Sequence, residues 1–207
     1  LIARSAGPLT LEDISPVTGD ALVTRTTRRL EAGGRLPGMT QDADVSWLDW
    51  SRIVEVSADG RHLLFDESGQ AVANQNVSYL RNLVTGGVTR LGDARALSLH
   101  PDGKSALLLP IEKPDHLLIA PLDGSAPRPT PPLGLSFQWA RYFPDGKSLL
   151  VSASKPNDGL RLYRAQLDAS TAPIPLSHPT AVRNHALSPD ATQVAFLDSK
   201  GRLFISP

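Results

Sequence analysis

The chain has 207 residues, 41% of them hydrophobic and 20% charged, which is typical of a folded domain and excludes global disorder. Because 21 Lys and Arg balance 21 Asp and Glu, the sequence does not predict the basic face that phosphate binding requires, and we expect no nucleic-acid partner. The longest apolar runs, residues 106–109 and 117–120, are far shorter than the roughly 20 residues of a membrane helix, so we expect no membrane insertion of this segment.

One tight turn recurs five times along the chain. Its copies lie at residues 13–20, 56–60, 99–103, 142–146 and 187–191, and three of them contain Asp-Gly. When the central residues Ser15, Ser57, His100, Phe143 and Ser188 are taken as equivalent, the spacings are 42, 43, 43 and 45 residues. Such a constant interval is typical of a protein built from structural repeats.

The elements that this period predicts are short strands. Apolar stretches flank each turn, as residues 53–56 and 63–65 do, and an Asp-Gly between such stretches predicts a hairpin. Third strands are expected at about 78–83, 116–121, 160–167 and 202–206, and short fourth strands end near Leu91, Pro129 and Leu176. The 18 Pro and 16 Gly recur too often for helices. Four antiparallel strands in about 43 residues is the layout of a β-propeller blade, so we predict an all-β propeller rather than a sandwich or an α/β fold.

We expect residues 1–207 to form a single propeller domain or a fragment of one, with repeats at about 9–50, 51–93, 94–136, 137–181 and 182–207. The start Leu1-Ile2-Ala3-Arg4 has no Met and predicts a piece of a longer protein without a secretory signal of its own. Residues 1–3 would supply the missing fourth strand of the last repeat if five blades closed a ring. We favour a ring of six or seven blades, because so short a strand closes a sheet weakly and unclosed blades expose strand edges.

The repeated turn, aligned with the apolar strand after it (63–65, 106–108, 148–151 and 194–196), resembles the TolB-like, WD-repeat-like propeller family over nearly the whole chain. More narrowly, Asp-Val-Ser-Trp-Leu-Asp-Trp-Ser at 44–51 and the segment 63–67 resemble propellers that follow the kinase domain in certain bacterial Ser/Thr protein kinases. The same repeats also occur in DNA-binding regulators and beside prolyl-oligopeptidase domains. The chain departs from the pattern at residues 17–20, which are irregular, and at Ala191, where Gly is expected.

The resemblance implies a non-catalytic scaffold for protein–protein or ligand binding, the sensory or interaction module of a larger bacterial signalling protein such as a kinase. It also implies an extracytoplasmic, periplasmic location. The alternative is a propeller that accompanies a hydrolase or peptidase and gates its active site. The partners that we expect are a protein or a small polar ligand, and, through open strand edges, the remaining blades or a second copy of the chain.

In a propeller the first strand of every blade faces the central channel. The position two before the central turn residue is Asp13, Glu55, Ser98, Arg141 and Ala186, and we call these residues the channel column. They alternate with an apolar column of Ile14, Val56, Leu99, Tyr142 and Leu187, as strand geometry requires. We therefore predict that Asp13, Glu55, Ser98 and Arg141 are ligand-facing and suited to a small polar molecule or a cation, against the simpler interpretation of a solvated channel with partly paired charges.

Other candidate sites have simpler explanations. No two of the five His lie three or four residues apart, there is no Cys, and we expect no metal site. Turn geometry accounts for Asp59, Asp102, Asp145 and Asp190 better than calcium does, so no cofactor is predicted. There is no Gly-x-Ser-x-Gly elbow, and we expect no catalytic residue. Among the aromatics, Trp139 is expected to pack, whereas Trp47 and Trp50 are candidates for facing a partner because one of two Trp three apart in a strand points outward.

Overall fold

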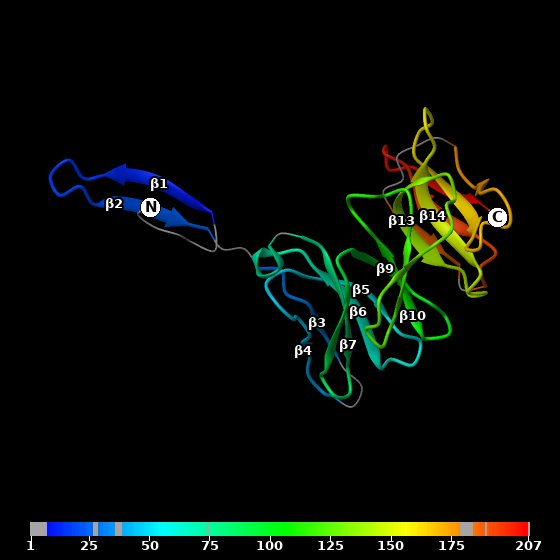
Figure 1. The fold of residues 1–207 in the computed structure, drawn as a ribbon, viewed down its shortest axis with the longest axis horizontal. Helices are drawn as coiled ribbons and strands as arrows, with labels where there is room; N and C mark the ends of the chain where they lie inside the picture. The colour runs from blue at the N-terminus through cyan, green and yellow to red at the C-terminus, as the bar shows by residue number, and fades with distance from the viewer. Residues whose placement is uncertain are drawn as a thin grey trace. The chain divides into compact units, whose positions relative to one another are not determined.

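The computed structural model describes residues 8–26, 29–35, 39–73, 75–178, 184–188 and 190–206. Within them the regular elements are strands and one 3-10 turn, η1 (Gln70–Val72), and no helix has the length and apolar character to cross a membrane (Figure 1). Two compact units are present. The first comprises Leu1–Arg52 and Glu67–Gln75, and the second comprises Ile53–Asp66 and Asn76–Pro207.

Four small antiparallel sheets, which we number blades 1 to 4, make up most of the second unit. Their strands follow one another in sequence order. Blade 1 contains β5 (Ser51–Val56), β6 (His62–Glu67), β7 (Val77–Asn82) and β8 (Val88–Gly92); blade 2 contains β9 (Arg95–Leu99), β10 (Ser105–Leu109), β11 (Leu118–Pro121) and β12 (Arg128–Pro129); blade 3 contains β13 (Ser136–Tyr142), β14 (Ser148–Ser154), β15 (Arg161–Gln166) and β16 (Ile174–Pro175). Blade 4 has three strands in the described residues, β17 (Asn184–Leu187), β18 (Val194–Leu197) and β19 (Leu203–Ser206). The predicted hairpins, third strands and fourth strands of these repeats are confirmed.

The core lies between neighbouring blades. Leu97, Leu107 and Leu109 of blade 2 pack in one buried cluster with Phe137 and Leu149 of blade 3. A second cluster joins blade 1 to blade 2, and a third joins blade 3 to blade 4. Because a middle blade is covered on both faces, its second strand has apolar side chains on both sides, which explains continuous runs such as the one in β10.

The turns have the geometry that the sequence predicts. Gly60, Gly103 and Gly146 have φ of 68°, 70° and 65°, the left-handed region that glycine adopts without cost. Ala191, which replaces the expected glycine, takes the same conformation with φ 58°. The Asp of each turn accepts the backbone N–H two residues on, as Asp145 does at 2.8 Å. This bond stabilises the reversal without a metal ion.

The first repeat differs from the expected blade. The hairpin around Ser15 is present as β1 (Leu9–Ile14) and β2 (Ala21–Arg25), but the other sheet that the structure describes before residue 51 has two strands, β3 (Gly33–Gly34) and β4 (Ala43–Asp44). All residues of β1 and β2 are exposed, and β3 consists of two glycines without side chains to pack. The described residues therefore form four blades and not five. The predicted strand at residues 1–3, as well as Pro189 of the last turn, lies outside the described residues.

Candidate functional site

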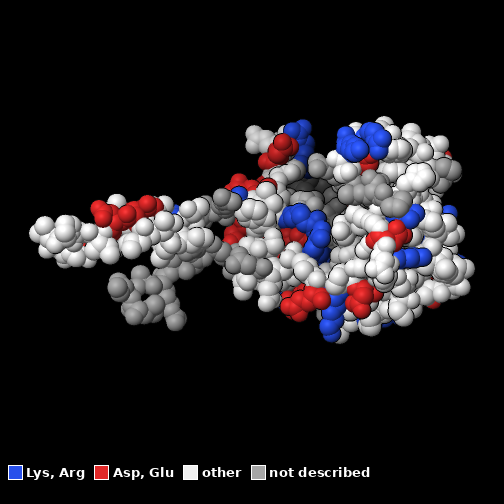
Figure 2. Space-filling model, turned by 90° about the horizontal axis from the view of Figure 1, so that it is seen from above, with Lys and Arg blue, Asp and Glu red and all other residues white. Residues whose placement is uncertain are grey.

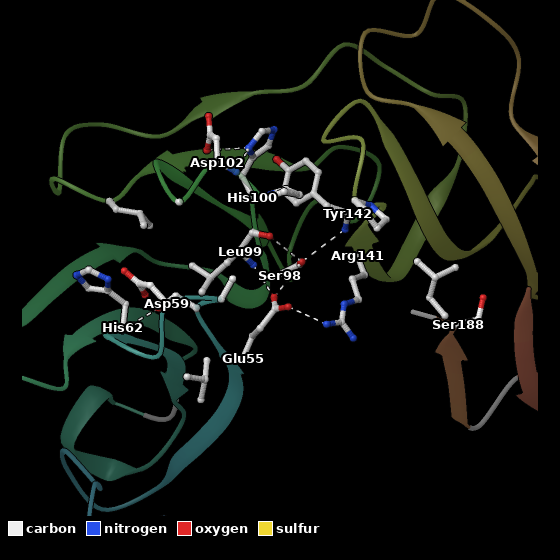
Figure 3. A pocket seen from close by; sticks show the side chains of 18 residues that line it. Glu55, Asp59, His62, Ser98, Leu99, His100, Asp102, Arg141, Tyr142 and Ser188 are labelled. Atoms are coloured by element: carbon white, nitrogen blue, oxygen red, sulfur yellow. Dashed lines mark hydrogen bonds and ion pairs between the residues drawn. The ribbon is translucent and has the colours of Figure 1, made fainter. Parts of the chain in front are cut away.

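A pocket of about 540 Å³ lies in the second unit where the inner strands β5, β9 and β13 reach their Asp-containing turns (Figure 3). All four blades contribute to its lining, blade 4 through Leu187 and Ser188. Its walls include three members of the channel column, Glu55, Ser98 and Arg141. The 43-residue period places the same strand position at the same level in successive blades, which is why residues so distant in sequence meet here.

Glu55 is the centre of this arrangement. Its Oε2 accepts the Leu99 N–H at 2.7 Å and the Ser98 hydroxyl at 3.1 Å, while its Oε1 accepts a guanidinium N–H of Arg141 at 2.8 Å (Figure 3). One carboxylate thus joins blades 1, 2 and 3. The fourth predicted ligand-facing residue, Asp13, lies on β1 in the first unit, where its Oδ1 accepts the Ile14 N–H.

Ser98 continues the chain of contacts between blades. Its Oγ accepts the Tyr142 N–H across 3.5 Å, so Glu55 and Ser98 each receive a backbone N–H from the inner strand of the next blade. The sequence assigned Leu99 and Tyr142 to the apolar column, and side-chain patterns carry no signal for these backbone donors. The sequence therefore did not predict that a side chain of the channel column accepts a backbone N–H of the neighbouring blade.

Carboxylates outnumber guanidinium groups in the lining of the pocket. It contains Glu55, Asp59 and Asp102 and one guanidinium, that of Arg141, together with the imidazoles of His62 and His100. Hydrogen bonds from the Ser57 hydroxyl and the Arg61 N–H lower the pKa of Asp59. Burial raises the pKa of Asp102, but hydrogen bonds from the Lys104 N–H and His100 outweigh it and lower the pKa overall. Both carboxylates are therefore ionised at neutral pH. On the face that Figure 2 shows, acidic and basic side chains are interspersed.

Two histidines flank the inner strands in different ways. At the pocket, Nε2 of His100 lies 3.0 Å from the Gly146 carbonyl, and its ring meets that of Tyr142 edge-on at 4.7 Å. On β17, His185 lines a second pocket of about 420 Å³ and contacts the ring of Trp139 at 3.8 Å between centroids. Burial, and secondly the charge of Arg141, lower the pKa of His185 to about 4. Its buried Nδ1 has no hydrogen-bond partner among the described residues.

The predicted aromatic residues separate into two roles. Trp139 packs against the clusters on both sides of blade 3, as expected. In the first unit Trp47 is 46% exposed, whereas Trp50 is half-buried. The loop that carries both is held by Glu67, a fully buried carboxylate that accepts the backbone N–H groups of Leu48 and Trp50 at 3.1 Å each and the hydroxyl of Ser51.

Within the part of the chain that the structure describes, no three His, Asp or Glu side chains are grouped so as to hold a metal ion. The turn carboxylates are separate from one another and each bonds within its own turn. Calcium prefers clustered oxygen ligands, and the described turn carboxylates form no such cluster.

Comparison with known proteins matches no family model and no curated protein. Among solved structures, TolB from Acinetobacter baumannii aligns with a TM-score of 0.60 and 20% identity over 81% of this chain, which spans 46% of the length of that protein. A putative TolB from Agrobacterium tumefaciens aligns with a TM-score of 0.67 and 15% identity, covering 97% of this chain and 81% of that one. A chain of the nidogen/laminin complex aligns with a TM-score of 0.60 and 14% identity, covering 86% and 74%. Together with the blades described above, these similarities show that the fold is a β-propeller of the TolB type.

Proposed function

We propose that this propeller is a non-catalytic binding module that receives a protein partner or a small polar ligand at the pocket around Glu55. The observation that carries the proposal is the pocket itself, because all four blades line it and charged side chains of two blades meet inside it. Ligand pockets in proteins are usually concave, have volumes of about 300–1,000 Å³ and contain a few convergent polar groups. The nidogen/laminin chain, a similar propeller, comes from a complex between proteins.

The chemistry of the pocket favours binding over catalysis. The Ser98 hydroxyl bonds to Glu55 and to the Leu99 carbonyl, and no hydrogen bond joins a histidine ring to a hydroxyl in the described part of the chain. A serine nucleophile needs a base within hydrogen-bond reach. Glu55 already accepts three donors and is therefore better suited to fixing the blades than to abstracting a proton.

The wider setting follows from the resemblance of residues 44–51 and 63–67 to kinase-linked propellers. We infer that the propeller is the sensory or interaction part of a bacterial signalling protein such as a Ser/Thr kinase, and that it lies outside the cytoplasm. A kinase domain and a membrane helix encoded upstream in the same gene would support this setting. A hydrolase domain with a nucleophile elbow would favour the alternative, in which the propeller gates a peptidase site.

Site-specific photo-crosslinking in the full-length protein, in its own cells, tests the binding role. A photoreactive amino acid is placed at Asp59 or at Asp102, both on turns at the pocket rim, and at Val84, an exposed turn residue that does not line the pocket. We expect covalent adducts of defined mass from the two rim positions and none from Val84. Equal labelling of all three positions, or no adduct from the rim, would contradict a binding role for this pocket.

A further inference from the structure

The inner strands of blades 2, 3 and 4 each direct one backbone N–H away from their own sheet. In antiparallel hairpins hydrogen-bonded and non-hydrogen-bonded residue pairs alternate. The N–H groups of His100, Phe143 and Ser188 bond to the carbonyls across their hairpins. The residue before each one therefore belongs to a non-hydrogen-bonded pair, namely Leu99 opposite Ala106, Tyr142 opposite Leu149 and Leu187 opposite Val194. Their N–H groups point away from the second strand, and β9, β13 and β17 are the edge strands of their sheets.

Two of these three donors are satisfied by the channel column of the preceding blade. Glu55 accepts the Leu99 N–H, and Ser98 accepts the Tyr142 N–H. The third donor is the Leu187 N–H, and the equivalent column residue of the preceding blade is Arg141. A guanidinium has five N–H donors and no acceptor. Arg141 therefore cannot accept a backbone N–H from the next blade, as Glu55 and Ser98 do. In the described residues no acceptor is found for Leu187 N–H.

Arg141 is itself only partly engaged. Its side chain is 48% exposed, and its single described contact is the one through Nη2 to Glu55. Arg141 and Leu187 both line the same pocket. The site thus has two kinds of hydrogen-bond donor without an acceptor among the described residues, guanidinium N–H groups and one backbone N–H. It lacks the side-chain oxygen that accepts the backbone N–H between blades 1 and 2 and between blades 2 and 3.

We infer that this pocket binds a carboxylate between the Arg141 guanidinium and the Leu187 N–H, at the place that Glu55 and Ser98 occupy in the earlier junctions. Planar guanidinium and carboxylate groups match in charge and geometry. The inference deepens the proposed function, since it uses the same pocket and names the class of ligand.

The other charges of the pocket define that class further. Asp59 and Asp102 are ionised at its rim, and Glu55 already balances the charge of Arg141. A ligand with negative charge alone would be repelled, whereas an ammonium group near the rim carboxylates is attracted. The ligand is therefore a zwitterion of the amino-acid or short-peptide class, with its carboxylate at Arg141 and its ammonium toward the turns.

Titration of the 207-residue chain with three small peptides, followed by isothermal calorimetry and by the NMR amide signal of Leu187, tests this assignment. Triglycine carries both charges, triglycine amide lacks the carboxylate, and N-acetyl-triglycine lacks the ammonium. We expect triglycine to bind at least tenfold more tightly than either derivative and to shift the Leu187 signal, because each lost charge-assisted hydrogen bond weakens binding by about that factor or more. Equal binding of the amide would overturn the carboxylate site, and equal or tighter binding of the acetylated peptide would overturn the zwitterion.

Variants give a second test. In Arg141→Gln the side-chain amide offers an oxygen to Leu187 N–H, so triglycine binding should fall at least tenfold while the fold is retained. The matched control is Arg90→Gln, on β8 outside the pocket, which should bind as the wild type does. Undiminished binding by Arg141→Gln would refute the site. If all three peptides fail to bind while rim crosslinks to a partner persist, the ligand class is wrong and the binding module stands.

Discussion

Replacing Glu55 by alanine removes the carboxylate that joins three blades, and the loss of its contacts lowers the free energy of unfolding. Leu99 is 8% exposed, so its N–H loses its acceptor with little access to water, which costs about 1–3 kcal/mol. The ion pair with Arg141 is partly exposed and adds at most about 1 kcal/mol. Ser98 still bonds to the Leu99 carbonyl. We expect the free energy of unfolding to fall by about 1–4 kcal/mol.

Glutamine at position 55 separates the hydrogen bond from the charge. Its amide oxygen can still accept the Leu99 N–H, so Glu55→Gln should cost about 1 kcal/mol or less. Equilibrium urea denaturation followed by circular dichroism measures both values, and amide hydrogen exchange at Leu99 locates the effect. Glu112→Ala, on an exposed loop, is the control and should change stability by less than about 0.5 kcal/mol. If the alanine and glutamine variants were equally stable, the hydrogen bond to Leu99 would not be what Glu55 contributes.

Three further changes follow from the structure. Gly146→Ala should destabilise by about 2–3 kcal/mol, because φ is 65° and a Cβ would lie 2.9 Å from the His100 ring. Burial and the charge of Arg141 lower the pKa of His185 to about 4, so as the pH falls the unfolded chain takes up a proton near pH 6.5, before the folded chain does. The free energy of unfolding should therefore decrease as the pH is lowered from about 6.5 to 4, and His185→Phe should make this decrease smaller. Ile205 is 63% exposed on the edge strand β19, so the isolated chain should associate, and Ile205→Lys should reduce association in light scattering.

Each of these changes has a matched control. Gly103→Ala has a φ of 70° but no atom within 4 Å of the new Cβ, and should cost only about 1 kcal/mol of backbone strain; equal losses at both glycines would exclude the ring contact as a cause. Val84→Phe, at an exposed turn residue without a titratable side chain, should leave the pH profile of urea denaturation unchanged, and an unchanged profile in His185→Phe would refute the assignment. Val84→Lys should not alter association, and a monomeric wild type at high concentration would favour a closed ring instead.

The period and the turn chemistry alone predicted most of the fold. Asp-Gly reversals are local, since the glycine adopts a positive φ and the Asp accepts a nearby N–H, so hairpins at Gly60, Gly103 and Gly146 follow from a few adjacent residues. Alternation along the inner strands likewise placed Glu55 and Ser98 on one face.

The sequence by itself determined the repeat and its strands, because these depend on contacts within about 43 residues, and it placed three of the residues that line the pocket at one strand position. The tertiary structure alone decided that Glu55 contacts Arg141 and that Leu187 N–H is left without an acceptor among the described residues. It also decided that the described part of residues 9–50 has two small two-stranded sheets in place of a four-stranded blade. The physical reason is that backbone donors at a sheet edge and pairing between blades depend on register and on neighbours distant in sequence. Residue types along one strand carry no record of either.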